Sequence, residues 1–476
     1  MTTLSVVGLG KLGACTAACF AYRGFEVIGI DVNRGFVDAV NQSKAPVCEP
    51  NLQELITAAG KRLTATQDWQ KIITDSDVTF LIVPTPSRPD GTFTDKYLCG
   101  ALGVLASELR KSDKKSHLFV ITSTVSPQTT EKNLIPLIES ASGRKLNKGF
   151  EVCYNPEFIA LGSVVRDFLN PDLVLIGQSS PVAGEKLEEI YTTVCQSKPY
   201  IARMSLVSAE IAKISLNSYV TMKISFANTL ANICESVPGS NVDDISSALG
   251  ADKRISPYYL RGGLAFGGPC FPRDNRAFAA FAAGFGVDAV LAKSTDNVNK
   301  MQTRHLTECV LDYVSQANSG AVGVFGLAYK PNPPVIEESP SIKLVEQLLA
   351  NEVEVVVYDP LAMDSTRAYF GDKIRYASSA KDCFAVASVC VIATQADEFK
   401  SIDASYFDGV PLTIIDCWRM LDPGKLGPNV MYVPFGAAQS GRPAQHRTPL
   451  GLREMKPSET RTHAGVLSGE VRVQES

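Results

Sequence analysis

The chain has 476 residues, of which 45% are hydrophobic and 20% charged, and its formal net charge is −4. This length suits two or three domains. The charge gives no basis for binding nucleic acid or an acidic membrane surface, and no apolar run is long enough to span a bilayer. Twelve irregularly spaced cysteines indicate reduced thiols in a cytoplasmic protein, and four histidines without a paired partner predict no metal site.

The first part of the chain alternates short β-branched runs with helical patterns. Strands are predicted at Leu4–Val7, Glu26–Ile30, Val78–Val83, His117–Ile121 and Leu173–Ile176. Helices are predicted between strands, for example at Leu12–Tyr22 and Tyr97–Leu109. The first apolar run lacks a basic segment before it and enters a glycine turn, which is typical of a strand and not of a signal peptide. The alternation predicts a doubly wound parallel sheet in a Rossmann-like domain over residues 1–202.

Helical patterns dominate the middle of the chain. Residues Ser205–Glu235 carry apolar side chains at helical spacing without Pro or Gly, which predicts one long helix. Further helices are predicted at Asp243–Leu249, Arg273–Phe285 and Ala289–Val314. We expect a helical central domain over residues 203–315, with a dimer interface on the long helix.

Strand patterns return in the last part of the chain. They occur at Ala321–Phe325, Glu354–Tyr358, Ser388–Ile392 and Leu412–Ile415. These runs predict a second Rossmann-like α/β domain over residues 316–438, structurally related to the first. Residues 439–476 are rich in Gly, Pro, Ser, Arg and Glu, so we expect a disordered tail there.

A glycine-rich motif stands between the first strand and the first helix. It comprises Gly8, Gly10 and Gly13, with Leu9, Lys11 and Leu12 between them. Glycines at this spacing permit a tight turn and bring a pyrophosphate close to a helix N-terminus. Asp31 ends the next strand, where an acid accepts a hydrogen bond from a ribose and repels a 2′-phosphate. The motif therefore predicts an NAD site.

A second candidate site surrounds Cys270. This thiol follows the pair Gly267 and Gly268, and Arg273 and Asp274 come just after it. The glycines would let backbone approach a substrate closely, and a nearby cation favours the thiolate, the nucleophilic form. A buried small residue is the alternative interpretation of the cysteine. A thiol combined with a nicotinamide cofactor predicts oxidation through a covalent sulfur intermediate.

Lys213 and Asn217 are four residues apart on the predicted long helix, so they share one face. Their N–H groups could stabilise a developing oxyanion. The alternative is an ordinary solvated face.

Several motifs in one order resemble the nucleotide-sugar dehydrogenase family, which includes UDP-glucose and GDP-mannose 6-dehydrogenases. Besides the two motifs above, they are Val83–Pro86, Ser123–Val125, Asn155–Phe158, Ala209–Lys213 with Asn217, and Gly326–Pro331. The resemblance extends to about Pro434. It implies a four-electron oxidation of a sugar C6 alcohol to a carboxylate with two NAD, through a cysteine thiohemiacetal and thioester.

The resemblance also implies roles for individual residues. Cys270 would be the nucleophile, Asp274 would assist proton transfers, and Lys213 and Asn217 would hold the C6 oxygen. Thr124 would hold a catalytic water, and Glu157 would act in hydrolysis. The remaining implied contacts are Thr85 and Arg273 with cofactor, Lys330 with substrate, and Arg254 with the substrate diphosphate of a partner subunit in a homodimer.

Two positions depart from the family pattern. Leu161 stands where many members have a second glutamate after Glu157, and Glu337 stands where an arginine normally meets the cofactor pyrophosphate. Lys11 replaces a common aromatic residue in the glycine loop and could restore part of that positive charge.

The sequence thus predicts an NAD-dependent nucleotide-sugar 6-dehydrogenase, with UDP-glucose as the leading substrate. TDP-glucose, GDP-mannose and N-acetylhexosamine nucleotides stay open as substrates. Two other functions also stay open: a two-electron β-hydroxyacid-type dehydrogenase and a non-catalytic NAD-binding regulatory protein.

Overall fold

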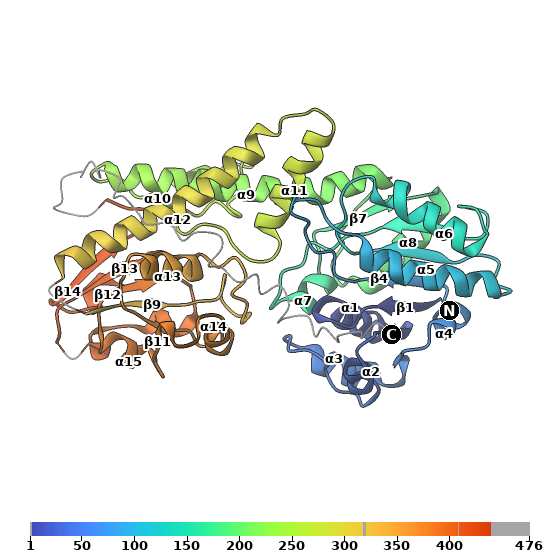
Figure 1. The fold of residues 1–476 in the computed structure, drawn as a ribbon, viewed down its shortest axis with the longest axis horizontal. Helices are drawn as coiled ribbons and strands as arrows, with labels where there is room; N and C mark the ends of the chain where they lie inside the picture. The colour runs from blue at the N-terminus through green and yellow to red at the C-terminus, as the bar shows by residue number, and fades with distance from the viewer. Residues whose placement is uncertain (1, 318–319, 408, 439–476) are drawn as a thin grey trace. The chain divides into compact units, whose positions relative to one another are not determined.

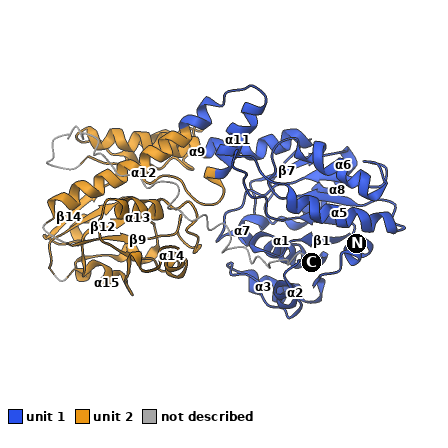
Figure 2. Cartoon of the chain, viewed as in Figure 1, with its two compact units in different colours: residues 1–220, 273–294 blue, residues 221–272, 295–476 orange. Residues whose placement is uncertain are grey.

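The computed structural model describes residues 2–317, 320–407 and 409–438. The chain forms two compact units, residues 1–220 with 273–294 and residues 221–272 with 295–476 (Figure 2). The predicted tail at 439–476 lies outside the described residues. Within the described ranges, no helix combines the length and apolar character that crossing a membrane requires.

The first unit is built on an eight-stranded sheet with the order β3-β2-β1-β4-β5-β6-β7-β8. Figure 1 labels β1, β4 and β7 of this sheet. Its strands are β1 (Thr3–Val7), β2 (Glu26–Ile30), β3 (Leu63–Thr66), β4 (Val78–Leu81), β5 (Leu118–Ile121), β6 (Glu151–Tyr154), β7 (Leu173–Gln178) and β8 (Tyr200–Ser205). The five strands predicted here are confirmed within two residues at each end. Strands β3, β6 and β8 were not predicted, because they are short or only partly apolar.

Helices cover both faces of this sheet. They are α1 (Lys11–Tyr22), α2 (Arg34–Asn41), α3 (Leu52–Ala59), α4 (Trp69–Asp75), α5 (Lys96–Lys111), α6 (Ile135–Ser142), α7 (Val164–Leu169) and α8 (Pro181–Val194). Successive β5 residues enter different cores: Leu118 packs in the cluster with α1, α7 and α8, and Phe119 packs in the cluster with α5 and α6. Burial on both faces explains why the parallel strands are continuous apolar runs.

One pair in the sheet is antiparallel, which the parallel prediction did not include. Strand β7 runs opposite to β6, with Tyr154 beside Gly177. Because β7 starts at the edge where β6 ends, the segment 155–172 stays at that edge. This is the carboxyl edge of β1, β4 and β5, where ligands bind in sheets of this type. The reversal therefore keeps Glu157 and its neighbours on the functional edge.

The second unit contains a six-stranded sheet with the order β11-β10-β9-β12-β13-β14, and all its pairs are parallel. Its strands are β9 (Ala321–Phe325), β10 (Val355–Tyr358), β11 (Arg375–Tyr376), β12 (Ala387–Ile392), β13 (Leu412–Asp416) and β14 (Val430–Pro434). Its helices α13 (Pro340–Ala350), α14 (Met363–Phe370) and α15 (Ala380–Phe384) belong to the same α/β region. The order matches that of the first six strands of the first sheet, as expected for two related halves.

The two sheets also share one loop geometry. Gly8 (φ +93°) and Gly326 (φ +90°) follow the first strand of each sheet, and each donates its N–H to the end of the neighbouring strand over 2.8 Å. In the next position, Leu9 N–H donates to Asp31 over 2.6 Å, and Leu327 N–H donates to Asp359 over 2.6 Å. The same strand order and the same loop therefore occur twice in the chain.

The predicted helices of the middle region are confirmed. They are α9 (Leu206–Ser236), α10 (Val242–Ala251), α11 (Phe271–Gly284) and α12 (Val290–Gln316). The long helix α9 has 31 residues.

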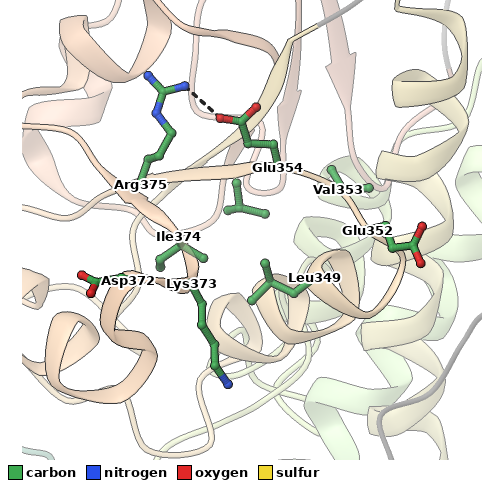
Figure 3. Close-up of a pocket in the computed structure, with 9 residues that line it drawn as sticks. Leu349, Glu352, Val353, Glu354, Asp372, Lys373, Ile374 and Arg375 are labelled. Atoms are coloured by element: carbon green, nitrogen blue, oxygen red, sulfur yellow. Dashed lines mark hydrogen bonds and ion pairs between the residues drawn. The ribbon is translucent and has the colours of Figure 1, made fainter.

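A pocket of about 430 Å³ lies in the second unit, near the end of α13 and the starts of β10 and β11 (Figure 3). Glu354 and Arg375 form an ion pair of 3.0 Å at its rim. Parallel strands begin at this edge, whereas Gly326 and Asp359 lie where strands end. The pocket is therefore on the edge opposite to the one where ligands of such sheets bind.

A buried polar chain crosses the first sheet near His117. The imidazole Nε2 lies 2.7 Å from the Thr79 hydroxyl, which lies 2.7 Å from the Ser5 hydroxyl. Burial lowers the pKa of His117 well below its usual range, and the cations Lys114, Lys186 and Arg144 act in the same direction. The histidine is therefore neutral in the folded protein at pH 7.

Acid should destabilise the fold through this histidine. In the unfolded chain His117 takes up a proton near its ordinary pKa of about 6.5, and the folded chain does not. Between pH 7.5 and pH 5.5, the free energy of unfolding of the wild type should thus fall by about 1 kcal/mol more than that of His117→Gln. Urea denaturation at both pH values measures this difference. An equal loss in the two proteins would contradict the prediction.

Candidate active site

The glycine loop of the first unit has the geometry of a dinucleotide site. A β-carbon on Gly8 would lie 2.2 Å from the Ile82 carbonyl oxygen, and one on Gly13 would lie 1.9 Å from the Gly8 carbonyl oxygen. Gly10 differs, because a β-carbon there would meet nothing within 4 Å. Two glycines thus allow the chain to pack, and the third leaves open space at the N-terminus of α1. A pyrophosphate fits such a space.

Asp31 lies beside this loop at the end of β2. Its carboxylate accepts hydrogen bonds from Leu9 N–H (2.6 Å) and Asn33 N–H (2.7 Å). These bonds fix the acid at the place where an adenosine ribose binds in this fold. The loop and the acid together fit NAD, as predicted. Lys11 is exposed and Leu12 is partly buried in the first turn of α1.

Thr85 and Thr124 come together after β4 and β5. The buried Thr85 hydroxyl donates to the Thr124 carbonyl over 2.7 Å. Ser123 makes a similar link, since its hydroxyl donates to the Val83 carbonyl over 2.7 Å. These bonds join two loops at the carboxyl edge of the sheet, so both threonines lie on the predicted functional edge.

Lys213 and Glu157 also meet. The Lys213 ammonium donates to the backbone carbonyl of Glu157 over 2.7 Å and lies 4.6 Å from the centre of the Phe158 ring. The lysine is 7% exposed, so the solvated-face alternative does not apply to it. Its contact with Phe158 is a cation–π interaction. The ammonium is therefore held at the start of the 155–172 segment.

Asn217 joins Asp274 one helical turn further along α9. The Asn217 amide donates to the Asp274 carboxylate over 2.6 Å, and Arg273 Nε donates to the other oxygen over 3.1 Å. Asp274 is 1% exposed and Asn217 is 7% exposed. The Arg273 guanidinium also lies 4.9 Å from the centre of the Phe93 ring. The first unit thus gathers a lysine, an amide and a carboxylate, which can bind and move protons at an oxygen substituent.

Cys270 belongs to the second unit, and its thiol is exposed directly before α11. The glycines before it are tightly packed. A β-carbon on Gly267 would lie 2.3 Å from the Glu338 carbonyl oxygen, and one on Gly268 (φ +82°) would lie 2.6 Å from the Tyr329 ring. Both glycines are thus required by packing against residues 329–338. The approach of a substrate to Gly267 stays a prediction.

Two predicted substrate residues lie elsewhere in the second unit. The Lys330 ammonium lies 5.7 Å from the centre of the Tyr329 ring, next to the loop that packs on Gly268. Arg254 has an 87% exposed side chain and pairs with Asp252 over 2.6 Å. Lys330 is therefore near the Cys270 loop, whereas Arg254 extends into solvent.

The structure places both departures from the family pattern. Leu161 is partly buried and packs against the core cluster that includes residues of α1, which suits an apolar side chain. The Glu337 carbonyl accepts a hydrogen bond from Gly268 N–H over 3.1 Å, which ties its backbone to the Cys270 loop.

Three residues at this edge had no role in the sequence prediction. The Tyr191 hydroxyl on α8 lies within 3.0 Å of both Asn155 and Glu157. Glu49 accepts hydrogen bonds from the N–H groups of Gly162 (3.1 Å) and Val164 (2.9 Å). Glu210 accepts from two N–H groups in the loop after Thr124. Of the three, only Glu210 lies in one of the motifs that carry the family resemblance, Ala209–Lys213. A single tyrosine or glutamate in a sequence has no spacing that would reveal its hydrogen-bond partners.

The fold and the glycine loop define a dinucleotide-dependent dehydrogenase. Three domain models of the UDP-glucose/GDP-mannose dehydrogenase family match the chain: the NAD binding domain over residues 2–195, the central domain over 207–301 and the UDP binding domain over 323–423. The chain therefore belongs to this family of NAD-dependent oxidoreductases of nucleotide sugars.

Individual relatives agree. A UDP-glucose 6-dehydrogenase of Haloferax volcanii is 38% identical over 406 residues, which cover 85% of this chain and 93% of the relative. A GDP-mannose 6-dehydrogenase of Pseudomonas aeruginosa is 34% identical, with 79% and 86% covered. The solved UDP-glucose dehydrogenase of Pyrobaculum islandicum superposes with a TM-score of 0.84 at 30% identity, covering 92% of this chain and 98% of that one.

Proposed function

We propose that the protein oxidises UDP-glucose at C6 to UDP-glucuronate, with Cys270 as the covalent nucleophile. The observation that carries the proposal is the exposed thiol at the end of a packed glycine turn, directly before α11. Most of the twelve cysteines are buried, and only Cys270 and Cys48 are exposed. Burial raises the pKa of thiols such as Cys15 and Cys153 to about 12, so these are inert.

The reaction consists of two oxidations, a thiol addition between them and a final hydrolysis. The C6 alcohol first loses a hydride and a proton and becomes an aldehyde. The Cys270 sulfur adds to the aldehyde carbon, and the thiohemiacetal loses a second hydride and a proton to give a thioester. Water then attacks the thioester carbon, the thiolate leaves, and the acid is released. NAD, when bound, accepts the hydride in each oxidation, so two NADH form per sugar.

The other predicted residues act around these steps. Lys213 and Asn217 donate to the C6 oxygen, and Asp274, held between Asn217 and Arg273, takes part in proton transfer. Thr124 and Glu157 serve the hydrolysis of the thioester. The remaining proposed contacts are Thr85 and Arg273 with NAD, Gly267 and Lys330 with substrate, and Arg254 with the diphosphate in a second copy.

The choice of UDP-glucose is supported by the relatives. The 38% identical relative and the superposed structure are both named for UDP-glucose, and the model over residues 323–423 is named for UDP binding. GDP-mannose is the competing substrate, because relatives named for it reach 34% identity.

The test is the NADH yield per sugar consumed across a panel of UDP-, TDP- and GDP-sugars. Two NADH per UDP-glucose, with this donor preferred, is the expected result. One NADH per sugar would overturn the thioester step, and preference for GDP-mannose would overturn the substrate. An absence of NADH with all donors would favour a non-catalytic NAD-binding protein.

A homodimer is part of the proposal. In the second unit, Phe226 and Ile233 are 53% and 52% exposed and lie seven residues apart on α9, so they share a face. Ile245 and Leu249, four residues apart on α10, are also exposed. A second copy of the chain would cover these apolar side chains and bring Arg254 to the neighbouring site. Light scattering should give twice the mass of one chain, and a single-chain mass would contradict this. The irregular spacing of the twelve cysteines also supports a cytoplasmic location.

A further inference from the structure

Asn155 fixes the direction of a buried hydrogen-bond chain in the first unit. This residue follows β6 and is 1% exposed. Its Nδ2 lies 2.9 Å from the Leu175 carbonyl oxygen, which can only accept a hydrogen bond. The amide must therefore donate to Leu175, and its Oδ1 must face the Tyr191 hydroxyl, 2.6 Å away. The opposite orientation would place two acceptor oxygens against each other.

The Tyr191 hydroxyl consequently lies between two acceptors. Its oxygen is 2.6 Å from Asn155 Oδ1 and 3.0 Å from Glu157 Oε1. A phenol hydroxyl carries one proton. This proton is donated to Asn155 Oδ1, because that contact is the shorter one and the amide oxygen has no proton of its own to donate. A charged Glu157 would then face the lone pairs of the tyrosine oxygen. A neutral Glu157 would instead supply the second proton and donate it to that oxygen.

The surroundings of Glu157 favour the neutral acid. Tyr191 comes from α8, Cys195 follows α8, Cys19 comes from α1, and Lys213 comes from α9. Burial raises the pKa of Glu157 to about 7, and the charge of Lys213 opposes the rise. A hydroxyl bond donated by Tyr191 would also lower this pKa, but the tyrosine proton is committed to Asn155. Burial raises the pKa of the Cys19 and Cys195 thiols, so both are neutral near pH 7.

We propose that Tyr191 is a positioning residue that holds Glu157 as a neutral acid, by accepting the hydrogen bond from its carboxyl group while donating to Asn155. In this state the carboxyl group faces Tyr191 on α8, and the Lys213 ammonium binds the backbone carbonyl of Glu157. Loss of the proton removes the bond to Tyr191, and the carboxylate is then attracted to Lys213.

This inference rests on the proposed function for its catalytic meaning. A neutral acid cannot take a proton from water, so Glu157 can serve thioester hydrolysis as a base only after it leaves the bond with Tyr191. Hydrolysis should therefore slow as pH falls below about 7, while the two hydride transfers have no such requirement. The protonation state itself can be measured without any turnover, which separates the two claims.

The test is isotope-edited infrared spectroscopy of the full chain labelled with ¹³C at glutamate carboxyl groups, with the spectrum of Glu157→Gln subtracted. The wild type should show a protonated carboxyl band that disappears with a midpoint near or above pH 7. In Tyr191→Phe the midpoint should fall by about one pH unit, a tenfold change, because the neutral acid loses its acceptor. A wild-type midpoint near the ordinary glutamate value of about 4.3, or a rise in Tyr191→Phe, would overturn the proposal.

Tyr154→Phe is the matched control, since Tyr154 is a fully buried tyrosine on the adjoining strand β6. Its substitution should leave the midpoint unchanged, and a shift equal to that of Tyr191→Phe would remove the specific role of Tyr191. Hydrolysis rates do not enter this comparison. A substrate other than UDP-glucose, or no turnover at all, would therefore refute the proposed function and leave the infrared result intact.

A stability measurement gives a second, independent readout. The pKa of Glu157 is raised in the folded protein, so its stabilising contribution is present below about pH 4.5 and is lost as pH rises through about 7. Glu157→Gln imitates the neutral acid. Its unfolding temperature should equal or exceed that of the wild type at pH 8 and should fall less between pH 5 and pH 8. A variant clearly less stable than the wild type at pH 8 would show that the carboxylate is the resting form.

Discussion

Cys270→Ser is expected to abolish uronate formation, with a loss of roughly 10³-fold or more. A serine hydroxyl is far less acidic than a thiol, so it is a much weaker nucleophile toward the aldehyde. The first hydride transfer does not use the sulfur, so at most one NADH should form per sugar. The measurement is NADH and uronate released per sugar, together with NAD affinity, which should stay near the wild-type value.

Cys48→Ser is the control for this experiment, because Cys48 is the other exposed cysteine in the described part of the chain. It should retain two NADH per sugar at close to the normal rate. Two NADH per sugar from Cys270→Ser, at more than a tenth of the wild-type rate, would refute the covalent role.

Two glycine substitutions should separate folding from cofactor binding. Gly13→Ala places a β-carbon 1.9 Å from the Gly8 carbonyl oxygen, and backbone at this position cannot move aside easily. The variant should lose about 1–3 kcal/mol of stability and its NAD affinity. Gly10→Ala meets nothing within 4 Å, so its stability should stay within about 0.5 kcal/mol of the wild type. Its β-carbon would enter the space where we expect the pyrophosphate, so NAD affinity should fall at least about tenfold.

Urea denaturation and NAD titration of both variants measure these effects. Normal NAD affinity in Gly10→Ala would show that the pyrophosphate does not pass over this residue. Normal stability in Gly13→Ala would show that the turn opens to admit a side chain.

Sequence patterns predicted the parts of the fold that depend on local chemistry. The turn at Gly8 and the acid Asp31 follow from steric and charge requirements that only certain residues meet. The helix over Leu206–Ser236 was visible because it is long and periodic. Strand β8 was not visible, because its side chains are only partly buried and its pattern is weak.

The arrangement of the site required the three-dimensional structure. Lys213 and Glu157 are 56 residues apart in sequence, and their contact depends on how α9 passes the end of β6. The reversal of β7 also depends on strand pairing that no local pattern specifies. Tyr191 is an ordinary helix residue in the sequence, and only the positions of Asn155 and Leu175 reveal how its single proton is used.

The repeated loop has a consequence for what each half of the chain can bind. Gly326 and Leu327 reproduce the bonds of Gly8 and Leu9, so Ala328 occupies the position that corresponds to Gly10. The Ala328 N–H also donates to Asp359 over 3.1 Å, and Ala328 carries a methyl group where Gly10 has none. The two halves of the chain thus share one loop geometry and differ at this position by a single methyl group, so we expect the second loop to leave less room than the first for a dinucleotide.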